Sequence, residues 1–111
     1  MRELTVREYF VMGPLLDDIE SVETILTLVN HPDVFAMKDM KRESFSAAEV
    51  KTILKRLTAD GLVKRVAFDQ QKKTWKVFHN TSRNIQNDWF DLTERGRSIS
   101  LQWLEKQETS K

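Results

Sequence analysis

A change of period within one continuous stretch, "SAAEVKTILKRLTADGLVKRV" (residues 46–66), constrains the fold more than any other feature. Its first part carries aliphatic residues at helical spacing, within one arc of about 100°. These residues are Val50, Ile53, Leu54 and Leu57. Ser46 and Glu49 match a capping box, and Gly61 stands where helices commonly end. Branched residues typical of a strand follow at once. The stretch therefore predicts a helix over 46–60 that turns directly into a strand.

The segment that follows predicts a hairpin and a closing helix. "LVKRVAF" (62–68) and "KTWKVFH" (73–79) are rich in branched and aromatic residues, and the polar residues 69–72 between them favour a turn. "DWFDL" (88–92) predicts a third strand. A helix is expected from Thr93 to about residue 108, slightly weakened by Gly96 in its first turn. Three of its residues are expected to face inward: Ile99, Trp103 and Leu104.

The N-terminal half predicts further helices. Thr5 and Glu8 match a capping box, which indicates a helix over 5–12 that Gly13 and Pro14 end, within an N-terminal segment 1–14. A second box at Asp17 indicates a helix that ends near Asn30. This helix opens a helical core over residues 17–60. A short third helix is possible in "PDVFAMKDMKRE" (32–43).

Length and composition bound the class of protein. The chain has 111 residues, which suits one domain over 1–111, and its 40% hydrophobic and 32% charged residues are typical of a soluble protein. No apolar run approaches the roughly 18 residues that span a bilayer, and the N-terminus does not read as a signal peptide. The absence of cysteine excludes disulfides and cysteine metal sites, and it fits a cytoplasmic protein.

Charge is unevenly distributed, although the net charge is only +1. Residues 1–37 carry two cations and seven acids, a net of −5. Residues 38–83 carry twelve cations and five acids, a net of +7, and residues 84–111 carry a net of −1. A basic middle between acidic flanks predicts one positive face. The alternative is that these charges scatter over a solvated surface.

The order of elements and two segments resemble bacterial regulators of the MarR, PadR and HxlR types. "ILKRLTADGLVKRV" resembles the end of their recognition helix and the start of their wing. "FDLTERGRSISLQWLE" resembles their exit from the wing into a helix. The resemblance, over about residues 20–105, implies an α+β fold of the winged helix-turn-helix type. Its recognition helix would be 46–60, its wing 62–92 and its closing C-terminal helix 93–108.

Two departures from that pattern bear on the wing. The MarR-type wing usually carries an Asp and an Arg at its tip, whereas this tip reads "DQQKK" (69–73) and has no Arg. The stretch between the wing and the closing helix, through "HNTSRNIQN" (79–87), is also longer than usual. Both departures weaken the expectation that the wing enters the minor groove.

A recognition helix fits the major groove of duplex DNA, with its first residues at the base edges and its cations near phosphates. The candidate contacts on helix 46–60 are Ser46, Ala47, Ala48, Lys51, Thr52, Lys55 and Arg56. Lys72 and Lys73 at the hairpin tip, and Lys41 and Arg42 before the helix, are candidates for the DNA backbone. Further cations would extend the positive surface: Lys64, Arg65, Lys76 and Arg83.

Each of these residues also has an ordinary structural interpretation. Amphipathic helices commonly expose lysines, and Lys72 and Lys73 suit any soluble turn. Glu49 is better explained as part of the capping box than as a reader of cytosine. Trp75 and Trp89 are more typical of a sheet core than of stacking platforms for bases. Trp103 is expected in a core or a dimer seam.

Catalysis has little support in the sequence. The two histidines, His31 and His79, are accompanied by no nucleophile triad, metal-ligand cluster or glycine-rich phosphate loop. We therefore expect no enzyme, metal or cofactor. The expected partners are duplex DNA and a second copy of the chain, joined through the apolar N-terminal helix and the helix around Trp103. A winged-helix module that binds another protein and no DNA is the alternative.

Overall fold

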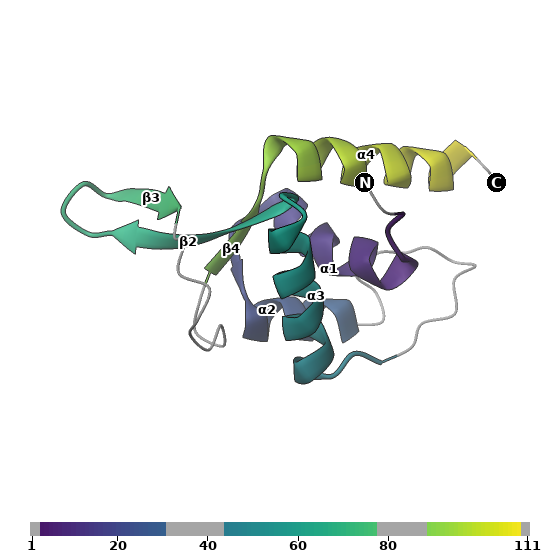
Figure 1. Ribbon diagram of the computed structural model, residues 1–111, viewed down its shortest axis with the longest axis horizontal. Coiled ribbons are helices and arrows are strands. Elements are labelled where there is room, and N and C mark those ends of the chain that lie inside the picture. The colour runs from purple at the N-terminus through teal and green to yellow at the C-terminus, as the bar shows by residue number, and fades with distance from the viewer. Residues whose placement is uncertain (1–2, 31–43, 78–88, 110–111) are drawn as a thin grey trace.

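The structure is a computed structural model that describes residues 3–30, 44–77 and 89–109 (Figure 1). Within these ranges the chain forms the elements α1 (Val6–Asp17), β1 (Glu20–Ser21), α2 (Val22–Asn30), α3 (Ala47–Ala59), β2 (Val63–Asp69), β3 (Thr74–Val77), β4 (Trp89–Leu92) and α4 (Glu94–Thr109). This order of helices, followed by an antiparallel wing and a closing helix, is the predicted winged helix-turn-helix. The possible third helix over 32–43 lies outside the described residues.

The N-terminal helix is longer than predicted. Thr5 caps α1, and both bonds of the predicted capping box with Glu8 are present. The expectation that Gly13 and Pro14 end this helix is wrong, because both lie inside α1. Proline removes a helical hydrogen bond and favours a break. Here the residues from Val11 to Leu15 are all buried, so burial of this turn in the core outweighs the local preference.

The second helix begins later than predicted. Asp17 is the last residue of α1 and not a cap, and residues 20–21 form the short strand β1. Ser21 takes the cap position instead, since its Oγ accepts a hydrogen bond from the Thr24 backbone N–H at 3.3 Å. The helix ends at Asn30, as predicted. Strand pairing with β4 therefore decides where α2 starts.

Asn30 fixes the start of α3 although 15 positions separate it from its partner. Its Nδ2 donates to the Phe45 carbonyl at 2.9 Å, and the Phe45 N–H donates to its Oδ1 at 2.7 Å. One side-chain amide thus satisfies both backbone groups of a buried residue. The pair joins the last residue of α2 to the residue before the α3 cap.

Helix α3 follows its prediction closely. Ser46 caps α3, the four predicted inward residues are all buried, and Gly61 ends the turn with a φ of 77°. Positive φ is where glycine is favoured over other residues. The Leu62 N–H donates to the Leu57 carbonyl, which turns the chain directly into β2.

The strands form one antiparallel sheet of four, in the order β1-β4-β2-β3. Val63, Phe90 and Leu92 lie on the sheet face that meets the helices, and they join the core with α1, α2 and α3. The β2–β3 hairpin projects from the body of the molecule (Figure 1). Its turn occupies residues 70–73, one position later than predicted.

The closing helix packs on α1. Thr93 precedes α4, and its Oγ1 accepts from the Gly96 N–H and donates to the Gly61 carbonyl. Tyr9 of α1 and Trp103 of α4 stack with ring centroids 4.7 Å apart, and Ile99 packs against the core. Among the described residues, no helix is long and apolar enough to cross a membrane.

Candidate nucleic-acid interface

The face of α3 opposite the core carries the predicted contacts. Ala48, Thr52, Lys55 and Arg56 are exposed along it, with Lys51 half-buried at its side. No described residue forms an ion pair with Lys51, Lys55 or Arg56. The outer face of α3 therefore carries small side chains at the first turn and positively charged side chains further along.

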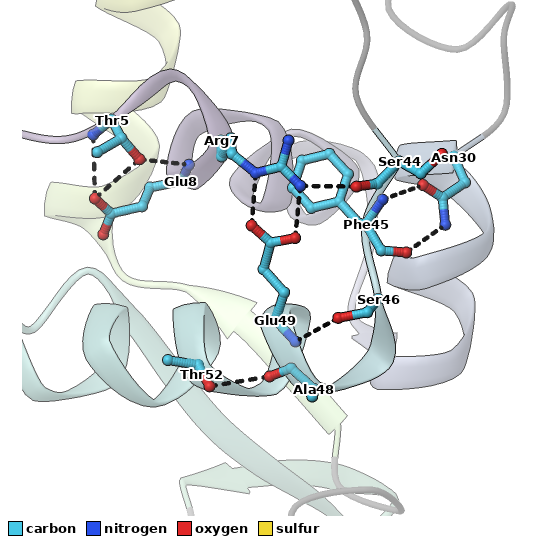
Figure 2. Close-up of polar contacts among 10 residues, drawn as sticks. All are labelled: Thr5, Arg7, Glu8, Asn30, Ser44, Phe45, Ser46, Ala48, Glu49 and Thr52. Carbon is cyan, nitrogen blue, oxygen red and sulfur yellow. Dashed lines mark hydrogen bonds and ion pairs between the residues drawn. The ribbon is translucent and has the colours of Figure 1, made fainter.

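Two hydroxyl groups of this face have local partners. The Ser46 Oγ accepts from the Glu49 N–H at 3.1 Å, and the Thr52 Oγ1 donates to the Ala48 carbonyl at 2.9 Å (Figure 2). Ser46 therefore acts first as the helix cap. The Thr52 methyl group and its remaining acceptor lone pairs are what that residue can offer to a ligand.

Glu49 does not complete the capping box, which corrects the prediction. Its carboxylate accepts two hydrogen bonds from Arg7, at 2.6 Å from Nε and 2.5 Å from the terminal nitrogen (Figure 2). The same Arg7 nitrogen also donates to the Ser44 carbonyl, and the guanidinium lies 4.0 Å from the centre of the Phe45 ring. Arg7 thus holds the start of α3 against α1. No local sequence signal indicates this contact, because the two residues are 42 positions apart.

The electrostatics of this pair keep Glu49 ionised. The hydrogen bonds from Arg7 lower the pKa of the Glu49 carboxyl, and they outweigh the opposing effect of its partial desolvation. The positive charge of Arg7 and the Ser46 backbone lower the pKa further. Both oxygens of the Glu49 carboxylate are thus engaged by Arg7.

A groove of about 340 Å³ runs between the first turn of α1 and the exposed side of α3. It is lined by Thr5, Arg7, Glu8, Ala48, Glu49, Thr52, Ile53 and Arg56. This groove brings the N-terminal helix next to the outer face of α3, where the predicted contacts lie. None of the contacts predicted from the sequence lies on α1.

The tip of the wing is built around Asp69. Its Oδ1 accepts from the backbone N–H groups of Gln71 and Lys72, and Lys76 lies 2.8 Å from its Oδ2. The hydrogen bond from Lys76 lowers the pKa of Asp69, as do the backbone bonds. Lys73 adopts a φ of 55°. Lys72 and Lys73 are both exposed, with no ion pair to any described residue.

Two further predicted cations, Arg65 and Lys76, are buried or already paired. Arg65 is buried, at 4% exposure, so the prediction that it extends this surface is wrong. It points to the core face of the sheet because strand side chains alternate. Lys76 is engaged by Asp69. Lys41, Arg42 and Arg83 lie outside the described residues.

The tryptophans of the wing are also placed differently from the prediction. Trp75 and Trp89 are exposed and do not form a sheet core. Their side of the sheet faces away from the helices, which already fill the other side. Within the described ranges, no group of three or more potential metal ligands comes together.

Comparison with known proteins supports the fold and goes no further. No protein-family profile matches the chain, and no curated protein sequence matches it. One similar solved structure is that of a Lactococcus lactis ZitR mutant, at 18% identity and a TM-score of 0.58. The match covers 98% of this chain and 58% of that chain. The chain described here therefore has a winged-helix fold, and it spans just over half of the length of the ZitR chain.

Proposed function

We propose that this winged-helix protein binds duplex DNA in a sequence-specific manner and regulates transcription as a homodimer. Helix α3 would lie in the major groove, with Ser46, Ala47, Ala48 and Thr52 near the base edges. Phosphates would be met by Lys51, Lys55 and Arg56, by Lys72 and Lys73 of the wing, and by Lys41 and Arg42. The observation that supports this most is the outer face of α3, where small residues are followed by cations without an ionic partner among the described residues.

A positive helix face attracts the phosphate backbone because each contact releases bound counterions. Ala48 at the exposed first turn lets the backbone approach a base pair closely. The Thr52 and Ala48 methyl groups suit the methyl group of thymine. Glu49 contributes by binding Arg7, which holds the first turn in place, and not by reading a base.

The homodimer is a separate part of the proposal. The aromatic faces of α1 and α4, which we expected in the seam, pack on each other within one chain. Val6 of α1 and Leu101 of α4 remain exposed, at 41% and 52%. These two residues are our candidates for the seam. Two copies would then address half-sites about 34 Å apart.

The test is a double substitution on α3, Lys55→Ala with Arg56→Ala. We expect weaker binding to specific and random duplexes alike, and a slope of log affinity against log salt that is shallower by about 2, since each lost phosphate contact removes about 0.9. Fluorescence anisotropy at several salt concentrations measures both quantities. Specific and random duplexes should be affected alike because both side chains would contact phosphates, which carry no sequence information.

The matched control is Arg95→Ala with Lys106→Ala, which removes the same charge from α4. This control is expected to keep the affinity and the salt slope. Equal binding by the α3 variant at every salt concentration would refute the DNA-binding face. Complete absence of duplex binding by the unmodified protein at low salt would favour the alternative, a winged-helix module for another protein.

A further inference from the structure

The wing carries an exposed aromatic surface that duplex recognition by α3 does not use. It consists of Phe68 on β2, Trp75 and Val77 on β3, and Trp89 on β4, and we call it the aromatic face. The four side chains are 41% to 47% exposed. Monomeric soluble proteins rarely leave large aromatic residues clustered in solvent without a function.

The strand register puts these residues on one side of the sheet. Phe68 lies opposite Trp75, while Val66 lies opposite both Val77 and Trp89. Directly paired residues point to the same side of a sheet. The opposite side carries Val63, Phe90 and Leu92, which are buried against the helices. Within the described residues, the aromatic face is therefore the side of the sheet that the helices do not cover, and only Val66 is buried on it.

The rings meet at angles and not face to face. Phe68 and Trp75 are 5.3 Å apart at 76°, and Trp75 and Trp89 are 5.8 Å apart at 58°. The third tryptophan differs, since Trp103 stacks on Tyr9 with an angle of 5° between the rings. One face of the Trp103 ring is therefore covered by Tyr9 within the chain. The three rings of the wing remain 41% to 46% exposed, and this exposed surface is what a planar ligand would stack on.

Positive charge borders the aromatic face at both ends. Lys72 and Lys73 stand at the hairpin tip, and Lys64 follows on the same side of β2 towards the body. None of the three has an ion pair with a described residue. Asp69 and Lys76 are paired on the other side of the hairpin, and Asp91, opposite Lys64, lies 3.9 Å from Arg97.

We propose that the aromatic face binds single-stranded nucleic acid, as a function separate from duplex recognition by α3. Bases would stack on Trp75, Trp89 and Phe68, and phosphates would lie towards the lysines. Aromatic rings combined with a positive border are the chemistry that holds single strands without sequence preference. A second copy of the chain fits this face less well, because its own lysines would repel those that border the face. Asp91, the one acid among the described residues of this face, already lies near Arg97.

The experiment uses the full chain with Trp103→Phe, which leaves the two wing tryptophans as the fluorescent reporters. Oligothymidylate of about 12 nucleotides, within the usual site size, is added at several salt concentrations. We expect quenching of the tryptophan emission and salt-sensitive affinity. Trp75→Ala or Trp89→Ala should weaken the affinity about tenfold, because stacking on each ring is lost.

Two further variants make the result specific. Trp75→Leu keeps an apolar side chain but not the aromatic ring, so it should weaken binding nearly as much as Trp75→Ala. Lys55→Ala with Arg56→Ala should leave single-strand affinity unchanged, while Trp75→Ala should leave duplex affinity unchanged. These opposite responses separate failure of this inference from failure of the proposed duplex binding. Circular dichroism checks that each variant is folded.

Three outcomes would overturn the inference. The first is an affinity for oligothymidylate that Trp75→Ala and Trp89→Ala do not change. The second is binding to duplex alone, with its affinity lowered by Trp75→Ala, which would assign the aromatic face to the duplex. The third is a sedimentation change from dimer to monomer in Trp75→Ala without any single-strand binding, which would assign this face to a second copy.

Discussion

Arg7 and Glu49 join the N-terminal helix α1 to the first turn of α3. Their side chains are about one-third exposed, at 28% and 34%, so solvent screens the ion pair. Two parallel hydrogen bonds to one carboxylate nevertheless fix its orientation better than a single contact would. Arg7 also reaches the Ser44 carbonyl, so one side chain orders both the helix and the residue before its cap.

We predict that Glu49→Gln lowers the free energy of unfolding at neutral pH by about 1 kcal/mol or less. The native pKa of Glu49 is below the unfolded value of 4.5, because Arg7 donates hydrogen bonds to the carboxylate. The stabilisation is therefore complete above about pH 4.5 and is lost as the pH falls through the native pKa. Urea unfolding of both proteins across this pH range measures the difference.

Glu23→Gln, which changes an exposed acid of α2, is the control for the loss of one negative charge. The difference in free energy of unfolding between Glu23→Gln and the unmodified protein should not show the pH dependence expected for Glu49→Gln, because Glu23 does not contact Arg7. A Glu49→Gln difference that does not shrink as falling pH protonates the carboxyl groups would mean that the hydrogen bonds from Arg7 do not govern the pKa of Glu49.

At the scale of elements, the contact between α4 and the turn after α3 depends on Gly96. A Cβ atom at this position would lie 1.9 Å from the Leu62 carbonyl oxygen, which is backbone and cannot swing away. The Leu62 carbonyl also accepts from the Thr93 N–H, so the turn and the start of α4 are tied together. Glycine is required here by close approach of two elements.

We predict that Gly96→Ala destabilises the protein by about 1 to 3 kcal/mol, as overpacking typically does. Helix propensity alone predicts the opposite, a gain of up to about 1 kcal/mol. Thermal or urea unfolding gives the sign directly. Ser98→Ala, at an exposed position of the same helix, is the control and should change stability little. A more stable Gly96→Ala protein would show that α4 can move away from Leu62.

At the scale of the whole molecule, the hairpin and the long closing helix extend a compact body to 47 × 27 × 26 Å. The core is shared by α1, α2, α3 and the inner side of the sheet, so α3 packs directly against α1, α2 and β2. The wing extends away from this core (Figure 1). The aromatic face lies on the strands β2, β3 and β4, whereas the other proposed surface lies on the helix α3.

Leu101→Glu tests the dimer proposed for this molecule. We expect this charge on the exposed side of α4 to convert a dimer to a monomer, since burying an unpaired carboxylate in a seam is costly. Sedimentation velocity over a range of protein concentrations measures the change. Gln102→Glu adds the same charge at the adjacent exposed position and should leave the dimer intact. A Leu101→Glu protein that stays dimeric would exclude Leu101 from the seam.

The sequence by itself determined the features whose physical cause is local. The cap at Ser46, the inward arc of α3, the left-handed Gly61 and the hairpin all follow from interactions between residues a few positions apart. These features are sufficient to predict the winged-helix order. They also predict which side of α3 faces away from the core, because helical spacing fixes both sides together.

Tertiary structure decided what depends on contacts between distant segments. Packing extended α1 through Pro14 and made Asp17 its last residue, not the cap of the next helix. It also brought Arg7 to Glu49, whose carboxylate accepts hydrogen bonds from the guanidinium. It also buried Arg65 while exposing Trp75 and Trp89. Strand alternation predicts that neighbouring residues face opposite ways, but only packing of the helices against one side of the sheet determines which side is core. Because the helices pack on the other side of the sheet, Trp75 and Trp89 of the wing are exposed.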